Sequence, residues 1–286
     1  MAPAKKSSLK NAPAKRALAL AATPLLKKIR GASHVGYDRV VFEFDGPVPA
    51  DFDVSFVPAI IGDPSGLPVP VIGQALLGVT FSLANGHDED GNVFTDAITT
   101  LGLKNVIQVV RSGDFEAVLS FGIGLAKQTQ FSVFTLTNPS RVVIDIKATF
   151  TTVPTQIFFV DSHAFAIGQG SYVRAVLRQV IPPNVGARSL NWLFAGPTPD
   201  ERAGGLTFVN SDATGFTNLT ISNGIARVRL VGGANSHGST LTIAKEIFPL
   251  LKQFPTVRWV KIYDQNGQTE TPTGQSDSIP AGLVPS

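Results

Sequence analysis

The sequence predicts an α+β protein with two domains, the first mostly β and the second mixed. At 286 residues the chain is long enough for two domains, and 43% hydrophobic with 16% charged residues is typical of a globular protein. The first half holds about seven short apolar runs of strand length and no convincing helix, which indicates a sandwich or an open barrel. The second half alternates strands with amphipathic helices.

The start of the first half shows the strand pattern most clearly. In residues 37–45, Val40, Phe42 and Phe44 alternate with more polar positions, so one face of this strand is expected to be buried. Residues 52–56 repeat the alternation after a Gly-Pro turn, which favours a hairpin. Further strands are expected at residues 76–83, 106–111, 115–123, 131–137 and 141–147.

A new β run starts at residue 156, so we expect the domains to be joined by a linker at 149–155. Residues 171–181 fit a helix or a strand, and their β-branched content before Pro182 favours a strand. The expected order is β-β-α-β-β-α-β, over residues 156–161, 171–181, 185–195, 216–222, 225–231, 239–254 and 257–263.

Two local signals in the second half are specific. Thr198 and Glu201, with a proline between them, form the pattern of a capping box at the start of a short helical turn. Asn223 and Gly224 tolerate positive φ, so they predict a type I′ hairpin turn.

Both ends of the chain are expected to lie outside the folded domains. The first 30 residues hold eight basic side chains and no acidic one, which leaves 16 basic and 21 acidic residues in the rest. We therefore expect residues 1–23 to be a basic disordered tail or a degenerate export signal, able to contact an anionic polymer. Residues 265–286, rich in Gly, Gln, Thr, Ser and Pro, are expected to be a disordered tail.

The residue patterns favour no catalytic chemistry. The chain has no cysteine, and its four histidines have none of the spacings of a zinc hydrolase. Asp88, Asp90 and Asn92 resemble part of a calcium loop, but Gly91 comes too early for that motif, so a solvated loop is favoured. We expect no catalytic residue, no metal and no cofactor.

A polar cluster at the start of residues 37–45 is the candidate binding site, formed by His34, Tyr37, Asp38 and Arg39. Arg39 can donate to a carboxylate or a saccharide oxygen, and Tyr37 can stack on a sugar ring. The alternative is a structural role, in which Arg39 pairs with Asp145 or Glu43 on the exposed face of the sheet.

Four segments of the first half together resemble the AMIN-like domain of secreted bacterial proteins. They are residues 34–44 (HVGYDRVVFEF), 87–91 (HDEDG), 113–116 (GDFE) and 141–145 (RVVID). The resemblance covers roughly residues 24–148. It implies a cell-envelope domain that binds cell-wall polymer, and it brings no catalytic residues.

The second half resembles the GerMN domain of sporulation and germination proteins over residues 156–264. The resemblance rests on residues 193–206 (LFAGPTPDERAGGL) and 221–228 (ISNGIARV), with Phe194 in place of a leucine. It implies a role in envelope-associated assembly or scaffolding.

Together these features predict a non-catalytic, extracytoplasmic envelope protein that binds peptidoglycan and acts as a scaffold. Its expected partners are cell-wall polymer or other envelope proteins, and self-association into a homo-oligomer is left open. Two alternatives remain at this stage. One is an accessory or metal-dependent cell-wall hydrolase component that uses His34 or His163 with the acidic loop around Asp88. The other is a structural subunit of an extracellular or viral assembly.

Overall fold

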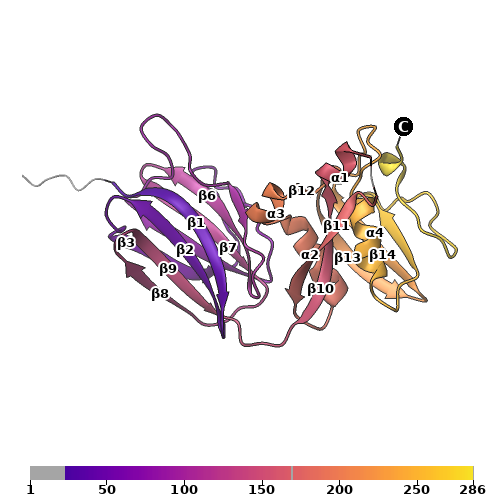
Figure 1. Ribbon diagram of the computed structural model, residues 1–286, viewed down its shortest axis with the longest axis horizontal. Helices are drawn as coiled ribbons and strands as arrows, with labels where there is room; N and C mark the ends of the chain where they lie inside the picture. Colours follow the sequence, from indigo (N-terminus) through magenta and orange to yellow (C-terminus); the bar gives the residue numbers. More distant parts are fainter. Residues whose placement is uncertain (1–22, 169, 286) are drawn as a thin grey trace, which may run out of the picture.

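The computed structural model describes residues 23–168 and 170–285. They form two domains side by side, with the β-rich domain first in the chain (Figure 1). The predicted tail at residues 1–23 falls almost entirely outside the described residues.

The first domain is a sandwich of two antiparallel sheets. One sheet has the order β1 (Leu25–His34), β2 (Tyr37–Asp45), β9 (Ser140–Lys147), β8 (Phe131–Leu136). The other has the order β3 (Asp51–Val57), β4 (Ala75–Ser82), β7 (Val118–Leu125), β6 (Val106–Phe115), β5 (Ile98–Thr100). Phe42 of the first sheet contacts Phe81 and Phe121 of the second, with ring centroids 5.2 and 5.1 Å apart. Of the two expected folds, the structure therefore shows the sandwich.

The hairpin expected between residues 37–45 and 52–56 is wrong, because β2 and β3 lie in opposite sheets. β2 is flanked on both edges, by β1 and β9, and so has no free edge for β3. Strand β1 was not expected, since its basic residues and Gly31 hide the alternation. It is an edge strand with a register shift between Leu26 and Lys28.

A buried polar network joins the two sheets near the start of β2. The Asp38 side chain is fully buried, and its carboxylate accepts from the Ser33 hydroxyl at 2.7 Å and from the backbone N–H groups of Asn105 and Val106 at 2.5 and 3.0 Å. The Asn105 amide in turn donates to the Thr129 hydroxyl at 2.9 Å and to the Lys147 carbonyl at 3.0 Å. Buried carboxylates and amides are costly unless satisfied, and these groups find partners across the sandwich.

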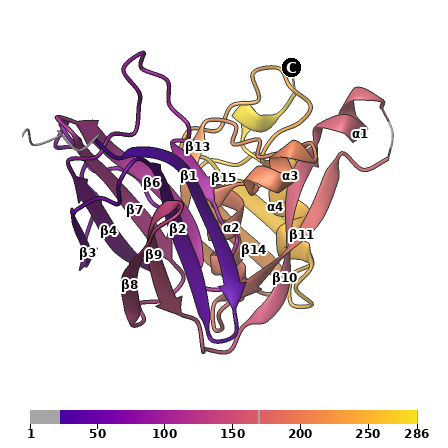
Figure 2. The ribbon, with the colours of Figure 1, turned by 60° about the vertical axis from the view of Figure 1, so that its left-hand side comes forward.

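The second domain holds two three-stranded sheets and two main helices (Figures 1 and 2). One sheet has the order β11 (Val173–Val180), β10 (Val153–Asp161), β12 (Leu206–Thr207), and the other has the order β13 (Ala213–Ser222), β14 (Ile225–Gly232), β15 (Trp259–Tyr263). The helices are α1 (Ser162–Ala166), α2 (Val185–Ala195), α3 (Pro199–Ala203) and α4 (Ala244–Lys252). Leu190 and Leu193 of α2 and Ile247 and Leu251 of α4 belong to one buried core with residues of both sheets.

The longer elements of this domain follow the order that the sequence predicts, whereas α1 and β12 were not expected. Residues 173–180 form a strand. The capping box is present, with the Glu201 N–H donating to the Thr198 hydroxyl at 3.3 Å and the Thr198 N–H donating to the Glu201 carboxylate at 2.8 Å. Asn223 and Gly224 have φ values of 51° and 77°, as a type I′ turn requires.

The disordered tail expected at residues 265–286 is wrong over the described residues 265–285. The Ser278 backbone pairs with β15, accepting from the Ile262 N–H at 2.9 Å and donating to the Val260 carbonyl at 3.0 Å. The Lys261 ammonium donates to the Thr273 carbonyl at 3.1 Å, and Leu283 is fully buried in the domain core. Polar composition suggested disorder, but the free edge of β15 supplies backbone partners.

The linker is also shorter than the expected residues 149–155. Val153 is already part of β10 and pairs with Val180, and Thr155 pairs with Arg178. Only residues 148–152 therefore separate β9 from β10.

The two domains share a contact surface on α2 and α3, which lie on the side of the second domain that faces the first (Figure 1). Ile107 of β6 is buried in the core of the second domain, near Trp192 of α2. The Thr100 hydroxyl donates to the Ala195 carbonyl, and Arg202 pairs with Asp96 at 2.6 Å. Apolar, neutral polar and ionic contacts therefore all cross this boundary.

Among the described residues, Glu246 of α4 is the one carboxylic acid buried in the core of the second domain. Its Oε1 accepts from the N–H groups of Val160 and Val209 at 3.1 and 3.3 Å, and its Oε2 has no hydrogen-bond partner among the described residues. Burial disfavours the charged form and raises the pKa of Glu246 well above its usual range.

We expect Glu246→Gln to stabilise the protein at neutral and alkaline pH. The folded protein holds this proton at pH values where the unfolded chain has lost it, so stability falls as pH rises above the unfolded pKa of about 4.5. The Glu246→Gln variant has no ionisable group at this position. The difference in free energy of unfolding between the variant and wild type should therefore grow between pH 4 and pH 8, as measured by urea titration. Exposed Glu89→Gln is the matched control. A stability difference that does not change with pH would contradict this prediction.

We also expect the C-terminal segment to contribute to stability. Removing residues 276–286 uncovers the edge of β15 and the site of Leu283, so the free energy of unfolding should fall by about 3 kcal/mol or more. Leu283→Ala alone should cost about 2–4 kcal/mol through the cavity it leaves. If both variants have the same free energy of unfolding as wild type in chemical denaturation, this segment behaves as the tail predicted from composition.

Candidate ligand-binding surface

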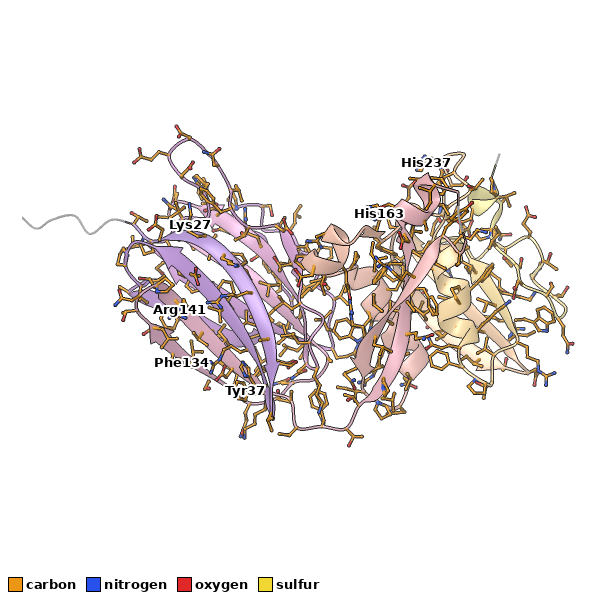
Figure 3. The ribbon with its side chains drawn as sticks, in the orientation of Figure 1. Lys27, Tyr37, Phe134, Arg141, His163 and His237 are labelled. Atoms are coloured by element: carbon orange, nitrogen blue, oxygen red, sulfur yellow. The ribbon has the colours of Figure 1, made fainter. Side chains whose placement is uncertain are left out.

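The candidate surface is the outer face of the sheet β1-β2-β9-β8, at the end where β2 begins. Side chains alternate along a strand, so Tyr37 and Arg39 point away from the core while Asp38 between them points into it. The register places Arg39 opposite Asp145 on β9, and Asp145 opposite Ser132 on β8. Figure 3 shows Tyr37, Phe134, Arg141 and Lys27 spread along this sheet.

Arg39 is held by a two-pronged ion pair. Its Nε lies 2.6 Å from one carboxylate oxygen of Asp145, and its Nη2 lies 2.7 Å from the other. The hydrogen bond to Asp145 raises the pKa of Arg39. The guanidinium carbon also lies 5.4 Å from the centre of the Tyr37 ring and 5.2 Å from that of Phe134. Both partners are partly exposed, so this cation is oriented but still accessible.

Two aromatic rings form a platform beside this ion pair. The rings of His34 and Tyr37 stack with centroids 4.8 Å apart and an angle of 14° between their planes. They belong to adjacent strands joined by a tight turn, in which Gly36 has a φ of 87°. Glycine allows this backbone conformation without strain, and the turn sets the two rings face to face.

Three of the four predicted site residues therefore lie together on the outer face, namely His34, Tyr37 and Arg39. Asp38 does not, because its carboxylate is fully buried in the network that joins the sheets. Its assignment to a binding site is corrected to a structural role. Arg39 pairs with Asp145, as the structural alternative predicted, and Glu43 pairs with Arg30 at 3.0 Å.

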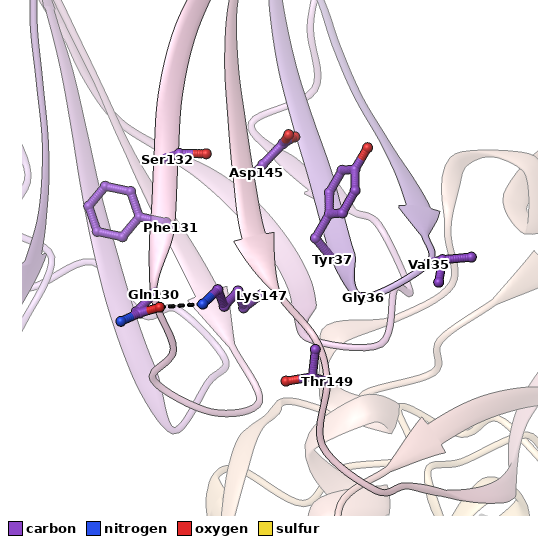
Figure 4. A pocket seen from close by; sticks show the side chains of 9 residues that line it. All are labelled: Val35, Gly36, Tyr37, Gln130, Phe131, Ser132, Asp145, Lys147 and Thr149. Atoms are coloured by element: carbon purple, nitrogen blue, oxygen red, sulfur yellow. Dashed lines mark hydrogen bonds between the residues drawn. The ribbon is translucent and has the colours of Figure 1, made fainter.

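A pocket of about 600 Å³ adjoins Tyr37 (Figure 4). Its lining includes Tyr37, Gln130, Phe131, Ser132, Asp145 and Lys147. The Lys147 ammonium donates to the Gln130 side-chain oxygen. Sequence reasoning missed Gln130, Phe131 and Lys147, because no motif marks them. The one available signal was alternation along β9, which places Lys147 on the same face as Asp145.

The other candidate residues lie elsewhere. His87 Nδ1 lies 2.8 Å from Asp114, and His237 Nε2 lies 2.9 Å from Asp212. The Asp88 carboxylate accepts from the backbone and the side chain of Asn92 within its own loop, and these bonds lower the pKa of Asp88. Among the described residues, no group of three or more His, Asp or Glu side chains could hold a metal ion.

The fold and this surface define a β-sandwich domain with an exposed polar and aromatic face. Comparison with protein families finds an AMIN-like domain at residues 24–148. No curated protein and no solved structure matches the chain. The GerMN resemblance of residues 156–264 thus has no support from the comparisons and stays a prediction.

The AMIN-like domain indicates an envelope protein associated with the cell wall and its peptidoglycan. Such domains occur in secreted envelope proteins, which supports an extracytoplasmic location. Within residues 23–168 and 170–285, no helix is long and apolar enough to cross a membrane.

Proposed function

We propose that this protein is a non-catalytic envelope protein that binds cell-wall polymer through the outer face of its first domain. The observation that carries the proposal is the Arg39 guanidinium, fixed by Asp145 beside the rings of Tyr37 and Phe134. A cation held next to aromatic rings on an exposed sheet offers hydrogen-bond donors and an apolar surface together.

The chemistry of this surface suits an amino-sugar polymer. Aromatic rings pack against the apolar faces of sugar rings, and the guanidinium can donate to hydroxyl and acetamide oxygens. Because the ion pair with Asp145 fixes the guanidinium before binding, less conformational entropy is lost when a ligand binds. The pocket beside Tyr37 gives the ligand a place to enter the surface.

The second domain is proposed to act as a scaffold, as its resemblance to GerMN domains implies. Its contacts through Ile107, Thr100 and Asp96 fix it to the first domain. A two-domain unit joined through these contacts would hold any partner of the second domain close to the wall. A link to sporulation or germination rests on the resemblance alone.

We expect the full chain to sediment with insoluble peptidoglycan, and Tyr37→Ala and Arg39→Ala to weaken binding by about 1–3 kcal/mol each. Arg30→Ala is the matched control, because it also removes one arginine from this sheet, but one that pairs with Glu43 instead of Asp145. Melting curves of each variant check that the fold is kept.

Equal binding by wild type and both site variants would place the wall contact elsewhere on the molecule. Release of soluble fragments from the wall by the wild-type protein would contradict the non-catalytic role and favour a hydrolase. No binding to peptidoglycan at all would overturn the proposed function.

A further inference from the structure

The pocket beside Tyr37 adjoins two further hollows, with which it forms a series that shares lining residues. A second hollow of about 520 Å³ shares Gln130 and Phe131 with it and adds Phe56 and Gln128. A third, of about 280 Å³, shares Phe56 and Gln128 with the second and adds Gln74. We call the three together the end groove. It runs from the outer face of one sheet to the other sheet.

The end groove lies where the two sheets both have a free edge strand. β8 is the last strand of one sheet and β3 is the last strand of the other. The ring of Phe131 on β8 meets that of Phe56 on β3 edge to face, with centroids 5.5 Å apart. Both rings are only partly buried, so they give the groove an apolar floor between the two edges.

Amide side chains line the walls. Gln74, Gln128 and Gln130 are all exposed, and each carries both a donor group and an acceptor oxygen. A primary amide of this kind pairs with a peptide group through a donor and an acceptor at once. Sugar hydroxyls can also bond to glutamine, but three amides beside an apolar floor match a chain of peptide groups and small side chains more closely.

The end groove also carries an unbalanced positive charge. Arg39 and Asp145 neutralise each other. Lys147 is exposed, and among the described residues no carboxylate lies within ion-pair distance of its ammonium group, which donates to Gln130. An exposed ammonium beside amide groups favours a carboxylate ligand.

We propose that the end groove binds the peptide branches of the wall polymer. The Lys147 ammonium donates to a free carboxylate of the peptide, and the glutamine side chains form hydrogen bonds with its peptide groups. The inference rests on the proposed function and adds that two regions of the surface bind different parts of the wall polymer. The rings of Tyr37 and His34 contact the glycan, and the end groove distinguishes a strand that carries peptides from a bare one.

The test measures binding of the full chain to two soluble probes by titration calorimetry. One is a disaccharide-peptide released from peptidoglycan, with a free terminal carboxylate, and the other is the same molecule with its carboxylates converted to carboxamides. We expect wild type to prefer the first. Lys147→Gln should weaken binding of the first about tenfold and leave the second unchanged, and Gln128→Ala should weaken both. Lys245→Gln in the second domain is the control for loss of one positive charge.

Two results would overturn the inference, and they are distinguishable. If Lys147→Gln and Gln128→Ala bind both probes as wild type does while Tyr37→Ala binds both more weakly, the groove assignment is wrong and the proposed function stands. If wild type binds neither the probes nor insoluble peptidoglycan, the proposed function fails and the inference fails with it.

Discussion

The arrangement of this surface depends on the alternation of side chains at the start of β2. Asp38 points inward and accepts three hydrogen bonds, two of them from the backbone at the start of β6 in the opposite sheet. Arg39, the next residue, points outward to Asp145. One residue of slip would exchange these two environments, burying an unpaired guanidinium and exposing the carboxylate that ties the sheets together. The register that holds the sandwich together is therefore the register that builds the candidate surface.

The same network shapes the pocket and groove. Asn105, whose N–H donates to Asp38, also contacts Thr129 and the Lys147 carbonyl through its side chain. The Thr129 hydroxyl donates to that same carbonyl at 2.7 Å. These bonds fix the segment before β8 against the end of β9, and so they set where Gln128, Gln130 and Lys147 lie. Residues that never touch a ligand thus position those that are proposed to do so.

The surface of the second domain that meets the first is held in place by contacts within the second domain. Arg178 of β11 is only 5% exposed and makes a two-pronged pair with Glu201 of α3, at 2.7 and 2.5 Å. The Glu201 carboxylate also caps α3 by accepting from the Thr198 N–H. Burial acts to raise the pKa of Glu201, but the hydrogen bonds from Arg178 and Thr198 outweigh it and lower that pKa. Gly102 of the first domain has a φ of 65°, and a side chain there would approach Thr198 and Arg178. The loop that holds Gly102 therefore fits closely against Thr198 and Arg178 of the second domain.

Local signals predicted local structure well. Alternation at Val40, Phe42 and Phe44 identified β2. The capping box and the Asn223-Gly224 turn could both be predicted because each involves neighbouring residues. Pairings between strands that are distant in the sequence could not be predicted. Nothing near β3 reveals that it joins β4 rather than β2, and residues 265–285 looked disordered because their partners on β15 are set by tertiary packing. Tyr37 and Arg39 were found by residue type. Lys147 and the glutamines become candidate binding residues only because two sheet edges lie next to each other in the folded domain.

The most direct test of the central claim is backbone amide hydrogen exchange of the full chain with and without a soluble disaccharide-peptide from peptidoglycan. The claim is that wall polymer binds at the outer face around Tyr37 and the adjoining groove. Added ligand should slow exchange in residues 34–39, 128–132 and 145–149 and leave α4 and β13–β15 unchanged. Slower exchange confined to residues 153–285, with none at the start of β2, would contradict the claim.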